Sequence, residues 1–238
     1  LVGDPIVSTV PYTLGTKSDA DKYVARMNLY SVKAMLARAY QAKGDNVKAV
    51  AYAKEVIESG KFRLLEFASV DQTEALSDVL FSDEHIFSLR NKELKDYSEK
   101  LHRDESKNGV TSFKPLPFGS YYNWYEGNND DVRYSKWFNL GDFMKYYMDN
   151  TDAFFRKMPM IKLSEMYLIV AECSFDTDSE TSLEYLNVLR DHRIRNHVHL
   201  QYLSKESIHD EMRREYLGEG QMWYVMKRNN LKIETGAS

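Results

Sequence analysis

The residues best suited to chemistry lie together between positions 121 and 131, where the chain reads Tyr-Tyr-Asn-Trp-Tyr-Glu-Gly-Asn-Asn-Asp-Asp. Aromatic rings can stack on the C–H faces of sugar rings, while amides and carboxylates can hydrogen-bond to sugar hydroxyls. Each ring contact contributes about 0.5–1.5 kcal/mol beyond the burial of area, so useful affinity requires several contacts. We therefore predict a small-ligand site formed by Tyr121, Tyr122, Trp124, Tyr125, Asn128 and Asp130.

Two other interpretations of this segment remain open. The aromatic rings can instead form a small core beneath a long loop. A glycoside hydrolase needs two carboxylates beside a sugar subsite, and Glu126, Asp130 and Asp131 are candidates, but adjacency in sequence does not establish their separation in space. Immediately downstream, Asp131 with Arg133 predicts an ion pair, and Trp137 predicts a packed ring, both structural in role.

Metal and cofactor sites have weaker support. His197 and His199 lie among arginines near an expected helix end, and a metal would need further ligands that the sequence does not indicate. The sequence has no Gly-rich phosphate loop, no G-x-S-x-G and no Cys–His pairing. We therefore predict no metal, no cofactor and no catalytic residue.

Composition narrows the class of protein. The 238 residues are 43% hydrophobic, with a formal net charge of −4 and no long basic tract, which does not favour a nucleic-acid partner. The longest wholly apolar run, Met166 to Ala171, is far shorter than the roughly 18 residues that indicate a membrane span. The single cysteine, Cys173, excludes an intrachain disulfide and is expected inside a helix.

Helical hairpins are the elements expected to position the aromatic segment. Residues 1–18 predict an extended lead-in, and 19–60 predict a first hairpin broken at Gly44-Asp45. Its first helix is expected to bury Leu29, Val32, Leu36 and Tyr40, and its second Val47, Val50, Ala53 and Ile57.

The rest of the chain predicts a loop-rich insertion over residues 84–158, which begins with a strand near Glu84 to Leu89. A second hairpin is expected over 159–195, followed by C-terminal helices over 204–230. We therefore predict one all-α domain over residues 1–238, with tetratricopeptide-type hairpins.

Several motifs occur in the order typical of one family. Val32–Tyr40 is similar to A-A-x-x-L-L-A-R-x-Y, Glu84–Phe87 to E-x-I-F, Pro159–Glu172 to P-x-x-R-x-A-E-x-Y-L-x-x-A-E, and Leu186–Arg193 to L-N-x-V-R-x-R. The last quarter follows the spacing of a C-terminal signature at Glu211, Arg213, Arg214, Glu215, Leu217, Glu219, Gly220 and Arg228. The chain thus resembles the SusD/RagB family. Met222 and Val225 replace the usual Arg and Asp, which indicates one lost ion pair.

The resemblance implies a non-catalytic lipoprotein on the surface of the bacterial outer membrane. Such a protein binds oligosaccharides and delivers them to a SusC-like TonB-dependent transporter. It also implies a parent chain about twice as long, whose lipid anchor is absent from this sequence. Two alternatives remain: peptide binding, as in RagB-like relatives, or a protein-interaction module without its own ligand.

Overall fold

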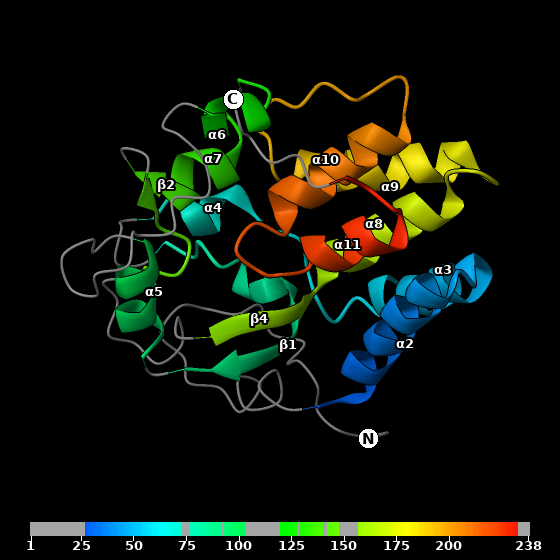
Figure 1. Cartoon of the computed structure of the whole chain (residues 1–238), viewed down its shortest axis with the longest axis horizontal. Helices are drawn as coiled ribbons and strands as arrows, with labels where there is room; N and C mark the ends of the chain where they lie inside the picture. The colour runs from blue at the N-terminus through cyan, green and yellow to red at the C-terminus, as the bar shows by residue number, and fades with distance from the viewer. Residues whose placement is uncertain are drawn as a thin grey trace.

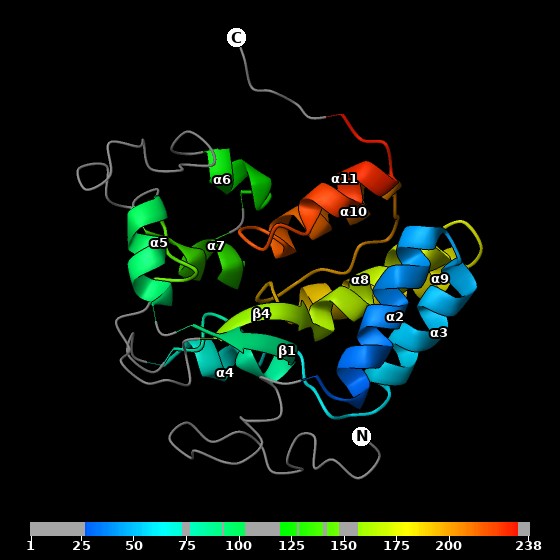
Figure 2. The ribbon, with the colours of Figure 1, turned by 60° about the horizontal axis from the view of Figure 1, so that its bottom comes forward.

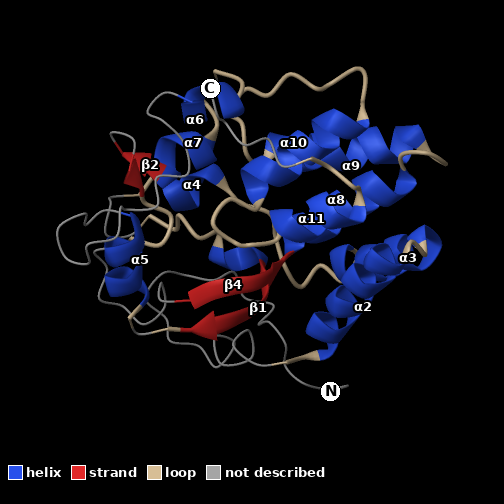
Figure 3. Cartoon of the chain, viewed as in Figure 1, coloured by secondary structure: helices blue, strands red, loops and turns tan. Residues whose placement is uncertain are grey.

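Helices form most of the framework, and two short sheets join them (Figure 3). The computed structural model describes residues 27–72, 77–91, 93–102, 120–127, 129–139, 142–147 and 157–232. The predicted lead-in, residues 1–18, and the start of the first hairpin, residues 19–26, lie outside this range. Figures 1 and 2 show α2, α3, α8 and α9 gathered at one end of the molecule and α5, α6 and α7 at the other.

The first hairpin consists of α2 (Leu29–Lys43) and α3 (Asn46–Ile57). Asn28 caps α2 in a capping box, and Gly44 ends it with φ 80°, a left-handed conformation that glycine adopts without steric cost. Asp45 then caps α3 by accepting a hydrogen bond from the backbone N–H of Lys48. Gly44 and Asp45 therefore end one helix and begin the next, as the sequence predicted.

The buried face of this hairpin differs from the predicted one. The helices meet through small side chains, and Ala34, Ala37, Ala49 and Ala53 are fully buried. Val32 and Val47, both predicted to face inward, are exposed. The prediction was wrong for these two valines, whereas Ala53 is buried as predicted. Close approach of the two helices favours small residues at their contact.

The second hairpin consists of α8 (Leu163–Ser174) and α9 (Ser179–Asp191), and α8 is buried along nearly its whole length. Cys173 is buried on α8, as predicted. Burial raises the pKa of its thiol to about 12, so the sulfur stays protonated. Helices α10 (Lys205–Glu215) and α11 (Met222–Arg228) follow, and Ile208, Met212 and Val225 extend the same core.

A two-stranded antiparallel sheet joins the hairpins to the region between them. Strand β1 (His85–Arg90) pairs with β4 (Lys157–Lys162), with His85 opposite Lys162 and Arg90 opposite Lys157. The sequence predicted β1 but not β4, which was assigned to the start of the second hairpin. Because β4 leads directly into α8, this pairing returns the chain to the core after the insertion.

Short elements make up the intervening region. They are α4 (Phe67–Val70), a 3₁₀ turn (Ser82–Glu84), α5 (Leu94–His102), α6 (Ser120–Trp124), α7 (Val132–Trp137), β2 (Phe138–Asn139) and β3 (Asp142–Phe143). A second cluster of buried apolar side chains, including Phe81, Trp137 and Phe143, stabilises them. Gly218 adopts φ 75° against the Phe143 ring, where an added Cβ would lie 2.8 Å from a ring carbon. No helix within the described ranges is both long and apolar enough to cross a membrane.

Buried charges link this region to α10 and to the segment that follows α9. Arg133 contacts Asp131 at 2.7 Å, Glu211 at 2.6 Å and Glu215 at 3.2 Å. Arg193 contacts Glu215 at 2.9 Å and Glu84 at 2.8 Å. We call these residues, with Lys162 and Glu219, the ionic cluster.

Lys162 completes the ionic cluster by contacting both Glu215 at 2.8 Å and Glu219 at 2.7 Å. Burial alone would raise the carboxyl pKa of Glu211, but the adjacent arginines outweigh burial and hold that pKa well below its usual value. The same competition, won by Arg193 and Lys162, depresses the pKa of Glu215. The predicted pairing of Asp131 with Arg133 and the packing of Trp137 are confirmed.

Candidate functional site

The predicted ligand-binding segment spans α6 and the turn that follows it. Tyr122 and Asp130 are exposed, and Trp124 is half-buried. Asn128 and the side chain of Tyr121 lie outside the described part of the chain. The structure therefore describes the side chains of four of the six predicted residues, three of which reach solvent.

Tyr125 does not reach solvent, and its predicted role is wrong. Its side chain is 1% exposed, and its ring packs against Tyr134 and Phe138. Its hydroxyl donates a hydrogen bond of 3.2 Å to the backbone carbonyl of Arg214. Tyr125 thus anchors α6 to α10 instead of presenting a ring face to a ligand.

The turn after α6 is held by two successive left-handed residues, Glu126 with φ 59° and Gly127 with φ 65°. The Gly127 N–H donates to the Tyr122 carbonyl at 2.8 Å, and a Cβ at Gly127 would meet the Tyr122 ring at 3.3 Å. Glu126 forms ion pairs with Arg190 at 2.9 Å and Arg214 at 2.8 Å. The turn that follows Trp124 is therefore held by its own hydrogen bond and by two ion pairs.

Trp124 borders a small pocket shared with α10. The pocket has a volume of about 140 Å³ and is lined by Asn123, Trp124, Asp210, Arg213 and Arg214; we call it the Trp124 pocket. The Arg213 guanidinium lies 5.7 Å from the centre of the Trp124 ring and pairs with Asp210 at 2.7 Å. A volume of this size is below the roughly 300–1,000 Å³ of most ligand pockets, so it suits one end of a ligand that extends over the surface.

The chemistry of the Trp124 pocket suits a polyhydroxylated ligand. An indole beside an amide, a carboxylate and a guanidinium offers one apolar face together with several hydrogen-bond donors and acceptors. The sequence indicated Trp124 but missed Asp210, which lies far along the chain. Arg213 was recognised only as a member of the C-terminal signature. Asp210 and Arg213 are three residues apart on an expected helix, and this spacing could have predicted that their side chains share one face.

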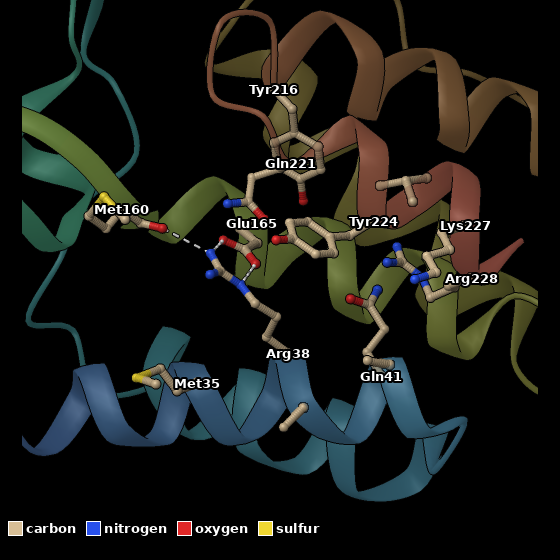
Figure 4. Close-up of a pocket in the computed structure, with 13 residues that line it drawn as sticks. Met35, Arg38, Gln41, Met160, Glu165, Tyr216, Gln221, Tyr224, Lys227 and Arg228 are labelled. Carbon is tan, nitrogen blue, oxygen red and sulfur yellow. Dashed lines mark hydrogen bonds and ion pairs between the residues drawn. The ribbon is translucent and has the colours of Figure 1, made fainter. Parts of the chain in front are cut away.

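A larger cavity lies between α2 and α11 (Figure 4). Its volume is about 770 Å³, and we call it the α2–α11 groove. Arg38 lies at its floor, with Nη2 at 2.6 Å from Glu165 and 2.9 Å from the Met160 carbonyl. The Tyr224 ring projects into the same space, with its hydroxyl toward Arg38 and Glu165 (Figure 4). Sequence reasoning missed this groove because its lining comes from α2, β4, α8 and α11.

Three carboxylates were considered for hydrolysis, and two of them are held in ion pairs. Asp131 is buried against Arg133, and Glu126 is held by Arg190 and Arg214. For Glu126, burial raises the carboxyl pKa, but the two arginines outweigh it and lower that pKa below its ordinary value. A lowered pKa suits a fixed anion better than a general acid, which needs a raised one.

Comparison with solved structures shows the same fold in larger proteins. A putative sugar binding protein from Bacteroides vulgatus is 24% identical, with a TM-score of 0.66; the alignment covers 90% of this chain and 51% of that one. A SusD superfamily protein from Bacteroides thetaiotaomicron is 23% identical, with a TM-score of 0.62 and coverage of 89% and 52%.

A further match is surface glycan-binding protein A from Bacteroides thetaiotaomicron, solved in complex with laminarihexaose. It is 16% identical, with a TM-score of 0.58 and coverage of 88% of this chain and 56% of that one. The chain therefore spans about half the length of the solved proteins that it resembles. Among curated proteins, none matches the chain.

The model of the SusD family matches residues 84–237, which is more than half of the chain. The matched range contains β1, β4, the second hairpin and the signature residues of α10 that build the ionic cluster. The resemblance seen in the sequence is thereby confirmed, and the chain belongs to the SusD family.

Proposed function

We propose that the protein binds oligosaccharides without catalysing a reaction, at a surface centred on Trp124. The observation that carries the proposal is the half-buried Trp124 ring beside Asn123, Asp210 and Arg213. Tyr122 and Asp130, both exposed in the same segment, extend this surface, and Asn128 is proposed as part of it. Binding relies on ring stacking and hydrogen bonds, so it needs neither a cofactor nor a metal.

The fold relatives support a glycan ligand over other small molecules. One related structure holds laminarihexaose, and another is described as a putative sugar binding protein. We further propose that the whole protein is a lipid-anchored component of the outer-membrane surface. There it passes its ligand to a SusC-like TonB-dependent transporter.

Isothermal titration calorimetry against a panel of oligosaccharides, with laminarihexaose first, tests the binding proposal. Trp124→Ala removes the stacking face and is expected to weaken binding at least tenfold, equivalent to about 1.4 kcal/mol. The thermal unfolding midpoint should change little, because the ring is only half-buried. Tyr224→Ala is the matched control, since it removes an exposed ring from the α2–α11 groove.

The outcomes separate the alternatives. If Tyr224→Ala weakens binding and Trp124→Ala does not, the glycan occupies the α2–α11 groove. Heat released by peptides, with none released by any glycan, would contradict the proposal in favour of peptide binding.

Transfer to a transporter is tested by affinity purification of the full-length lipoprotein from outer membranes. A TonB-dependent transporter should co-purify in stoichiometric amount. Co-purification without binding of any glycan or peptide would favour the interaction-module alternative. Glycan binding without co-purification would contradict only the proposal of transfer.

A further inference from the structure

Three potential metal ligands converge at the C-terminal end of α9. Asp191 is the last residue of α9, and His197 and His199 lie in the loop that follows. One ligand atom from each lies within 4.8 Å of the others. The carboxylate of Asp191 is 2.8 Å from His197 Nδ1 and 2.9 Å from His199 Nε2. The sequence indicated the two histidines but not the third ligand, Asp191, so no metal was expected here.

These distances are close to what one metal ion requires. Zinc binds imidazole nitrogen and carboxylate oxygen at about 2.0–2.2 Å, so two of its tetrahedral ligands lie roughly 3.3 Å apart. Small movements of His199, whose side chain is 57% exposed, would open the cluster to that spacing. Asp191 is also partly exposed, so an ion can enter from solvent.

Electrostatics at this position favour a cation. The backbone carbonyls at the C-terminus of a helix carry partial negative charge, and Asp191 adds a full one. Arg190, which contacts His197, carries an opposing charge, but Glu126 and Glu211 pair with its guanidinium at 2.9 Å and 2.7 Å. Arg193 and Arg195, in the same segment, also pair with carboxylates.

Arg190 also determines which ring nitrogen of His197 carries the proton. Its Nε donates to His197 Nε2 at 3.1 Å, which leaves the His197 proton on Nδ1, facing Asp191. For Nδ1 to bind a metal, this proton must move to Nε2, and the hydrogen bond from Arg190 must break. Metal binding at His197 Nδ1 therefore replaces two hydrogen bonds, the one from Arg190 and the one to Asp191, with coordination bonds.

We propose that Asp191, His197 and His199 form a binding site for a divalent transition metal of the zinc class. Imidazole with carboxylate selects Zn²⁺, Ni²⁺ or Cu²⁺ over Ca²⁺ and Mg²⁺, which prefer all-oxygen ligands. Three protein ligands leave the remaining position to water or to a group supplied by a ligand or partner.

Titration of the tag-free protein with Zn²⁺ in a calorimeter tests the site. One ion per chain is expected, and equal concentrations of Mg²⁺ or Ca²⁺ should not compete. His199→Ala should weaken binding at least tenfold, and Asp191→Asn should weaken it while keeping the shape of the side chain. Val198→Ala, between the two histidines, is the matched control and should leave binding unchanged.

Two further readouts distinguish metal binding from a general effect on folding. Zn²⁺ should raise the thermal unfolding midpoint of the wild type but not that of His199→Ala. Co²⁺, used as a probe, should show ligand-field absorption only in proteins with all three ligands. Equal Zn²⁺ affinity in the wild type and His199→Ala, or equal loss in Val198→Ala, would overturn the proposal.

Discussion

Two neighbouring ion pairs on α10 use the same chemistry in opposite environments. Arg214 pairs with Glu211 at 2.8 Å with side chains 8% and 0% exposed, whereas Arg213 pairs with Asp210 at 2.7 Å with side chains 42% and 46% exposed. Each pair joins residues three positions apart. The inward pair belongs to the group of buried charges around the ionic cluster, and the outward pair lines the Trp124 pocket.

The two pairs differ in what their removal would cost the fold. Removing one member of a buried ion pair strongly destabilises the fold, because its partner is left buried without an opposite charge. An exposed pair contributes about 0–1 kcal/mol to stability, so its members are free to contact a ligand. We infer that the buried signature residues of α10 hold the scaffold, and that the exposed face of the same helix, which carries the signature residue Arg213, is available to a ligand.

The largest expected loss of stability comes from neutralising Glu215, the anion at the centre of the ionic cluster. Glu215→Gln keeps the size of the side chain but leaves Arg133, Arg193 and Lys162 short of one negative charge. Breaking a buried network in this way costs about 3–5 kcal/mol in the free energy of unfolding. Urea denaturation measures the change.

Glu206→Gln, in the exposed first turn of the same helix, is the matched control. It should change the free energy of unfolding far less, because an exposed charge in the first turn interacts only with the helix dipole and with solvent. An equal loss of unfolding free energy in the two variants would contradict the proposed difference between buried and exposed charges.

Acid should reveal the buried charges without any mutation. Burial alone would raise the pKa of Glu172, but His209 and Arg228 outweigh it and lower that pKa to about 2. Because the pKa in the folded state is lower than in the unfolded state, the stabilisation is complete above about pH 4.5 and disappears as the pH falls toward 2. Glu172 alone accounts for about 3 kcal/mol at 1.36 kcal/mol per pKa unit.

Asp78 opposes this trend over part of the range. Burial raises its pKa to about 6, so protonation stabilises the folded state between about pH 6 and pH 4. The net loss of stability should therefore become steep below pH 4. Urea denaturation at a series of pH values measures how the free energy of unfolding changes with pH. A weaker pH dependence below pH 4 in Glu172→Gln would attribute the loss to Glu172. A profile that stays level down to pH 2 would contradict the assignment.

The smallest expected effect concerns the outward pair. Arg213→Ala should change the free energy of unfolding by less than about 1 kcal/mol, because both partners are solvated. It should nevertheless weaken glycan binding if the Trp124 pocket is the site. Arg214→Ala is the comparison variant, and it should destabilise the fold more because Arg214 contacts Glu211, Glu126 and the Trp124 carbonyl. A larger loss of stability in Arg213→Ala would reverse the comparison.

The sequence predicted the scaffold well because its signals are local. Capping residues such as Asp45 and the break at Gly44 act within a few positions, and the structure confirms them. The order of motifs located both hairpins and the C-terminal helices. On α2 the prediction failed at Val32, which is exposed, because helix packing buries the small Ala34 and Ala37 and the hydrophobic period does not rank side chains by size.

The candidate site was harder to predict because its partners are distant in sequence. Tyr125 is buried by contacts that include Arg214, 89 residues further along. The Trp124 pocket needs Asp210 and Arg213 from α10, and the α2–α11 groove joins four elements. Composition marked Trp124 and Tyr125 as equivalent, and only tertiary contacts show that one ring is accessible and the other is not.

Arg214 makes two hydrogen bonds to the end of α6. Its Nε donates to the Trp124 carbonyl at 2.6 Å, and its own carbonyl accepts from the Tyr125 hydroxyl. The backbone that carries the indole is thus held in the free protein, so the entropy of ordering it is lost during folding and not during the proposed binding of a glycan. Free and glycan-loaded crystals should then superpose closely over α6.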